Sequence, residues 1–104
     1  MATILVVDDE KSIRRVLEIA LAKKGYNVLT AKNGAEGIYL AQNNQIDLVI
    51  TDIRMPGMDG NQVCKEIQGI NANIKFIGIS GTPWFMDGDL FDYTFTKPFS
   101  IKNG

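Results

Sequence analysis

The sequence predicts one α/β domain in which a five-stranded, mainly parallel β-sheet is doubly wound, with helices on both faces. Its 104 residues fit a single domain, since one domain usually needs about 100 to 200 residues. Short apolar runs alternate with longer segments of helical periodicity, the order of βαβ units. Hydrophobic residues make up 45% and charged residues 22%, which favours a folded chain over a disordered one. Without repeats or a linker, residues 1–104 are predicted to form one domain.

The first strand and helix have clear patterns. Residues 3–7 (TILVV) are a β-branched apolar run, long enough for a buried strand and too short for a helix. Residues 12–24 show the apolar stripe of an amphipathic helix. The stripe consists of Ile13, Val16, Leu17, Ala20 and Leu21. Gly25 follows and is typical of a left-handed helix cap.

The rest of the chain repeats this alternation. Further strands are predicted at 26–31, 46–51, 74–80 and 93–96, and helices at 35–42 and 59–68. The connection 81–92 is the shortest, close to the minimum of about 10 to 12 residues for a crossover that includes its helix. Its sequence, GTPWFMDGDLFD, leaves room for a turn or two of helix. The residues after Pro98 are too few for a closing helix.

Composition excludes several kinds of site. The chain has no histidine, which excludes histidine zinc sites, Ser-His-Asp triads and phospho-histidine relays. The single cysteine, Cys64, excludes an internal disulfide and is expected in the core. A net charge of −1 favours neither nucleic acid nor a membrane surface as partner. Apolar runs are too short for a membrane span and no signal segment is evident, so a cytoplasmic location is expected.

Polar residues follow the predicted strands at one edge of the sheet. They are Asp8 and Asp9 after the first strand, Asp52 after the third, Ser80 at the end of the fourth and Lys97 after the fifth. Since sites form at the carboxyl ends of parallel strands, we expect these side chains to converge. Carboxylates about 4 Å apart repel by roughly 4 kcal/mol per pair at an effective dielectric near 20. A hard divalent cation such as Mg²⁺ would relieve this repulsion, and Lys97 would suit a phosphate.

Each of these residues also has an ordinary structural interpretation. An acid at a strand end often caps the next helix, a serine can be a turn hydroxyl, and an isolated lysine is usually solvated. Trp84, Phe85 and Phe91 would normally be core residues, although they lie in a short polar connection. The coincidence of all the strand-end positions favours a shared site.

The motifs around these residues resemble the response-regulator receiver domain. They are ILVVDDE (4–10), DLVITDIRMPGMDG (47–60), IKFIGISG (74–81) and TKPFS (96–100). The resemblance spans residues 2–101, in the family's order and spacing except in the fourth connection. It implies a flavodoxin-like sheet of strand order 2-1-3-4-5, here with a truncated fourth helix and no fifth helix.

The resemblance also implies a magnesium site and a phosphoacceptor. Asp9 and Asp52 would bind Mg²⁺ directly together with the backbone carbonyl of Arg54, and Asp8 would act through water. Asp52 would accept the phosphoryl group. Lys97 would contact that group, and Ser80 would supply the hydroxyl that moves toward it.

The position three residues before Lys97, usually aromatic in the family, is Thr94, with Tyr93 and Phe95 on either side. The residue that carries the switch is therefore left open among these three.

The function implied is a phosphorylation-dependent signalling switch, with a histidine kinase or phosphotransfer protein as partner, and not an enzyme acting on other substrates. The alternative is a receiver-like binding module that works by constitutive association with little phosphotransfer. A metal-dependent phosphohydrolase would need a second acid two residues after a nucleophilic aspartate; Asp8 and Asp9 are adjacent, although Glu10 fits that spacing. A flavodoxin-like cofactor site is disfavoured because the loop DDEKS is acidic.

The expected lack of a fifth helix has a further implication. Strands such as ILVV and LVI are apolar on both faces, as strands covered on both sides should be. One face is therefore expected to keep exposed aliphatic side chains, which predicts a homodimer through the uncovered sheet face. The alternative is a marginal fold that aggregates.

Overall fold

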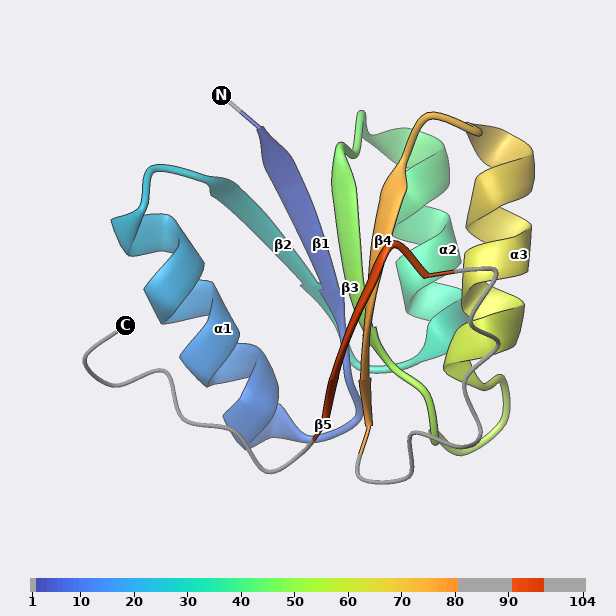
Figure 1. Ribbon diagram of the computed structural model, residues 1–104, viewed down its shortest axis with the longest axis horizontal. Helices are drawn as coiled ribbons and strands as arrows, with labels where there is room; N and C mark the ends of the chain where they lie inside the picture. The colour runs from blue at the N-terminus through green and yellow to red at the C-terminus, as the bar shows by residue number, and fades with distance from the viewer. Residues whose placement is uncertain (1, 81–90, 97–104) are drawn as a thin grey trace.

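The computed structural model describes residues 2–80 and 91–96. Five parallel strands form one sheet in the order β2-β1-β3-β4-β5, as the resemblance implied. The strands are β1 (Thr3–Val7), β2 (Asn27–Ala31), β3 (Leu48–Asp52), β4 (Lys75–Ser80) and β5 (Tyr93–Thr96). The helices are α1 (Lys11–Lys23), α2 (Gly34–Asn43) and α3 (Gly60–Ile70). Helix α1 lies on one face of the sheet and α2 and α3 on the other, so the sheet is doubly wound (Figure 1).

The core has two layers, one on each face of the sheet. Alternate residues of β1 face opposite layers, because side chains along a strand point to opposite sides. Leu5 and Val7 join the layer beneath α2 and α3, which also contains Phe91. Ile4 and Val6 join the layer beneath α1. Both faces of the strand are therefore apolar, as predicted for a parallel sheet covered by helices.

Local sequence signals set the helix ends. Helix α1 is followed by Gly25 in the left-handed region, with φ 93°, as predicted. Helix α2 begins after Asn33, whose side chain accepts a hydrogen bond from Glu36 N at 2.8 Å. Helix α3 begins after Asp59, which forms a capping box with Gln62. These caps satisfy backbone N–H groups that have no partner inside the helix.

The register of the strands aligns their carboxyl ends. Val7 pairs with Ala31 on one side and with Thr51 on the other. Asp52 pairs with Ile79, the residue before Ser80. Residues that follow β1 and residues that end β3 and β4 therefore lie at the same edge.

The structure differs from the predicted pattern at two places on the α1 side. Val16, predicted to face the core, is 44% exposed, because α1 packs over β1 and β2 and the predicted stripe is wider than that contact. The expectation that the sheet itself would be exposed on this side is wrong for Ile50 and Ile79, which are 6% and 4% exposed. Among the described residues, the exposed large aliphatic side chains on this side are Val16 and Ile19 of α1, and Tyr93 of β5 is 68% exposed.

Several predictions concern parts of the chain outside the described residues. These are the truncated fourth helix, the lack of a fifth helix, and the placement of Trp84 and Phe85. Among the helices that the structure describes, none has the length and apolar character needed to cross a membrane.

Candidate functional site

Four carboxylates meet at the carboxyl ends of β1 and β3. Asp8, Asp9, Glu10 and Asp52 each place one oxygen within 4.8 Å of the others. Asp8 and Asp52 are 1% and 5% exposed, whereas Asp9 and Glu10 are exposed. We call these four residues the acidic cluster. Its possible ligands are hard carboxylate oxygens at the carboxyl-end edge of the sheet. Such oxygens suit Mg²⁺ better than a soft metal.

Three members of the acidic cluster were among the predicted site residues, and the fourth was not. Asp8, Asp9 and Asp52 lie together, as their positions at strand ends predicted. Glu10 had been considered only for the hydrolase alternative. Its place directly after two site acids, at the start of a helix, was the signal that could have identified it.

The loop that carries Asp8 is held by hydrogen bonds that involve its backbone and the Asp8 side chain. Asp8 N donates to Ala31 O at 3.1 Å, and Asp8 Oδ1 accepts from Glu10 N at 2.8 Å. The Asp8 carbonyl oxygen accepts from the Arg14 guanidinium at 2.7 Å. Because Glu10 is the N-cap of α1 and its side chain makes no capping bond, neither Asp8 nor Asp9 is the helix cap that the ordinary interpretation suggested.

Asp52 is the last residue of β3, and its side chain is held by the backbone N–H of the next residue. Its Oδ1 accepts a hydrogen bond from Ile53 N at 2.9 Å. The same N–H reaches Ile79 O at 3.2 Å, which ties the end of β3 to β4. The carboxylate therefore has a defined orientation within a buried setting.

Gly60, the first residue of α3, lies against the backbone of Asp52. Its N–H donates to Ile53 O at 2.8 Å. A Cβ at this position would clash with the Asp52 carbonyl oxygen and lie 2.9 Å from Ile53 Cα. Only glycine fits this approach. This role is not among the sequence predictions, although a glycine directly after the cap Asp59 is a signal that could have indicated it.

The other predicted site residues are placed in part. Ser80 ends β4 and is 1% exposed; it lies one residue beyond the partner of Asp52. Arg54 is exposed two residues after Asp52. Lys97 lies outside the described residues, as do the side chains of Thr94 and Phe95.

Cys64 is a core residue, as predicted. It is completely buried on α3. Burial raises the pKa of its thiol far above the ordinary value, and the nearby Asp92 carboxylate raises it further. A thiol that remains protonated is a poor nucleophile, so Cys64 supplies packing and not chemistry.

The raised pKa of Cys64 predicts a loss of stability in alkali. The unfolded chain releases the thiol proton above the ordinary pKa of 9.0 while the folded chain keeps it. The free energy of unfolding should therefore fall as the pH rises through 9. At pH 10 it should be about 1.4 kcal/mol lower than at pH 8. Urea denaturation at pH 8 and pH 10 should show this extra loss in the native chain and not in Cys64→Ala. Equal losses in both would assign the effect to other groups.

Sequence comparison places this chain among phosphoacceptor signalling domains. The family model for the response regulator receiver domain matches residues 4–88. The alkaline phosphatase synthesis transcriptional regulatory protein PhoP of Bacillus subtilis is 43% identical over 95% of this chain and 43% of its own length. The transcriptional regulatory protein GlrR of Escherichia coli is 41% identical over 73% of this chain and 17% of its own length. The chain thus spans less than half of either relative.

Comparison with solved structures finds the same family. The response regulator protein TrrA of Thermotoga maritima, solved in complex with Mg²⁺-BeF, has a TM-score of 0.87 and 35% identity, covering 99% of this chain and 92% of TrrA. The receiver domain of the hybrid histidine kinase CckA has a TM-score of 0.81 and 37% identity, covering 98% of this chain and 91% of that domain. Both similarities extend over nearly the whole chain.

Proposed function

Since this chain belongs to the response-regulator receiver domain family, whose members are phosphorylation-dependent switches of two-component systems, we propose that Asp52 is its phosphoacceptor. The observation that carries the proposal is the position of the Asp52 carboxylate, which is buried, oriented by Ile53 N–H and surrounded by three further carboxylates. A binding module without phosphotransfer would have no need of four acids in one place. That alternative is not favoured.

The proposed reaction uses the Asp52 carboxylate as the nucleophile. An oxygen of Asp52 attacks the phosphorus of a phosphorylated histidine on a kinase or phosphotransfer protein. An O–P bond forms, the P–N bond to the donor imidazole breaks, and that imidazole takes up a proton, leaving an aspartyl phosphate. We place this exchange in the cytoplasm. The chain acts only on its own phosphoryl group and so is not an enzyme in the usual sense.

The acidic cluster supplies the metal ligands in this proposal. Asp9 and Asp52 would bind Mg²⁺ directly with the Arg54 carbonyl, and Asp8 would act through water. The TrrA complex with Mg²⁺-BeF supports this assignment by similarity. An ion held by these residues would neutralise charge on the transferring phosphoryl oxygens. Lys97 would add a second positive charge.

A direct test uses a small phosphodonor. Incubation of the chain with Mg²⁺ and acetyl phosphate should add the mass of one phosphoryl group, and a chelator should prevent this. Failure to gain mass with Mg²⁺ present would favour the binding module. Steady turnover of a generic phosphate ester would instead favour the phosphohydrolase.

Ser80 is proposed to read out the phosphoryl group. We expect Ser80→Ala to accept phosphate, because no metal ligand or nucleophile is lost, but to show a smaller conformational response. NMR amide shifts of β4 and β5 on addition of Mg²⁺ and beryllium fluoride measure that response. A response as large as that of the native chain would contradict the switch role of Ser80.

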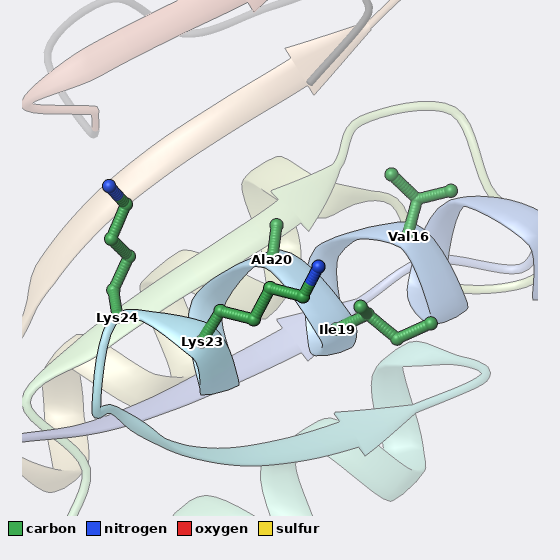
Figure 2. A pocket seen from close by; sticks show the side chains of 5 residues that line it. All are labelled: Val16, Ile19, Ala20, Lys23 and Lys24. Carbon is green, nitrogen blue, oxygen red and sulfur yellow. The ribbon is translucent and has the colours of Figure 1, made fainter. Parts of the chain in front are cut away.

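We also propose that two copies associate through the exposed side of α1. Val16 and Ile19 are 44% and 46% exposed, and with Ala20 they line a shallow depression of about 370 Å³ that ends at Lys23 and Lys24 (Figure 2). Basic residues lie at both ends of α1: Lys11, Arg14 and Arg15 near its start and Lys23 in its last turn. A two-fold arrangement would bring the apolar centres of the two copies together.

Association predicts a concentration-dependent mass. Light scattering at micromolar concentration should give twice the mass of the chain, and Ile19→Glu should give the monomer without loss of fold because the side chain is exposed. A monodisperse monomer in the native chain would contradict the proposal.

A further inference from the structure

We propose that Arg14 is a positioning residue for the metal-binding loop, an inference that rests on the proposed function above. Its guanidinium donates to the main-chain oxygen of Asp8 at 2.7 Å, six residues back along the chain. Asp8 begins the segment that carries three of the four carboxylates of the acidic cluster. The bond thus joins the first turn of α1 to the loop whose side chains would hold Mg²⁺.

The bond from Arg14 is one of several hydrogen bonds that hold Asp8. On the sheet side, Asp8 N donates to Ala31 O at the end of β2. On the helix side, Glu10 N donates to Asp8 Oδ1, and Arg14 N donates to Glu10 O at 3.2 Å. Arg14 therefore holds both ends of the short loop, one through its backbone and one through its side chain. A hydrogen bond from a charged donor is stronger than a neutral one.

A positioning role and a purely electrostatic role predict opposite results. A positive charge beside four carboxylates opposes the binding of a cation, so removal of any such charge should strengthen Mg²⁺ binding. Loss of the Arg14 contact should instead loosen the ligand loop and weaken binding, because the ligands must then be ordered when the metal binds. The direction of the change distinguishes the two roles.

The chain offers a matched control at the next position. Arg15 has the same charge on the same turn of α1 but is exposed, whereas Arg14 is half-buried and contacts the loop. Glutamine keeps part of the apolar stem and has a similar helix propensity to arginine. Arg14→Gln and Arg15→Gln therefore differ mainly in the contact with Asp8.

The experiment is a calorimetric titration of the full chain with MgCl₂. We expect the Kd of Arg14→Gln to rise about fivefold or more, and that of Arg15→Gln to stay equal or fall. Arg14→Lys, which keeps a charged donor, should recover most of the affinity. Acetyl phosphate labelling of Arg14→Gln should need more Mg²⁺ for half its maximum, yet reach the native extent at saturation.

Thermal melts check that each variant is folded, and Arg14→Met, which keeps the apolar stem, should repeat the loss if Arg14→Gln is unstable. Unchanged or tighter Mg²⁺ binding in both folded Arg14 variants would overturn the inference while leaving the proposed function intact. A native chain that binds no Mg²⁺ and takes no phosphoryl group would overturn both.

Discussion

Asp52→Asn is expected to reduce phosphoryl labelling of this chain to background while the fold stays intact. Asparagine has the shape of aspartate and keeps an oxygen that can accept from Ile53 N–H, the bond that orients the native side chain. Its amide is not a nucleophile toward phosphorus, and one negative charge is removed from the acidic cluster. The loss should be complete because Asp9 and Glu10 are exposed. Asp8, the other buried acid of the cluster, is assigned to the metal through water in the proposed function.

The measurement is the intact mass after incubation with Mg²⁺ and acetyl phosphate, with lability in base as the sign of an acyl phosphate. Asp47→Asn makes the same change just before the opposite end of β3. Asp47 accepts a hydrogen bond from Thr3 N at 2.8 Å, which asparagine can preserve, so this variant should label normally. Labelling of Asp52→Asn at the native level would show that another residue is the phosphoacceptor.

Gly60→Ala is expected to cost about 3 kcal/mol of stability and to disturb the site as well. The new methyl group would clash with the Asp52 carbonyl oxygen, and both neighbours at this contact are backbone. Backbone atoms cannot rotate away as a side chain can, so either β3 or the start of α3 must shift. Overpacking typically costs about 1 to 3 kcal/mol, a large part of the roughly 5 to 15 kcal/mol that stabilises a small domain.

Gly69→Ala is the matched control on the same helix. A Cβ at Gly69 would meet nothing within 4 Å, so alanine should stabilise α3 by up to about 1 kcal/mol through its helix propensity. Urea denaturation of the two variants should therefore shift in opposite directions, and Gly60→Ala should also label more slowly with acetyl phosphate. A Gly60→Ala chain as stable as the native one would show that the approach of α3 to Asp52 is not tight in solution.

The features of the site that could be predicted from sequence are those set by chain direction. Parallel strands bring their carboxyl ends to one edge, so apolar runs ending in Asp8 and Asp52 were sufficient to predict that these carboxylates meet. The two faces of β1 could also be predicted, because the alternation of side chains along a strand is a local property. The limits of the strands were harder to predict. Ile46 is buried and apolar, yet pairing within β3 starts at Leu48, since register depends on partners elsewhere in the chain.

Contacts that depend on loop geometry and side-chain rotamers could not be predicted. The place of Gly60 against Asp52 arises from the angle at which α3 leaves the loop, and the bond from Arg14 to Asp8 depends on a side-chain rotamer. Val16 fits the apolar stripe of α1 but is exposed, because periodicity gives the apolar side of a helix and not the width of the surface that it covers. Such features depend on tertiary packing.

The acidic cluster also makes folding and ion concentration interdependent. Four carboxylates within 4.8 Å of one another oppose the compact state, because the unfolded chain can separate them. Any cation that binds only the folded state shifts the folding equilibrium in its favour by mass action. The chain therefore sacrifices part of its intrinsic stability to keep a reactive site, a common compromise between stability and function. The proposed magnesium site would therefore make the measured stability of the chain depend on the magnesium concentration.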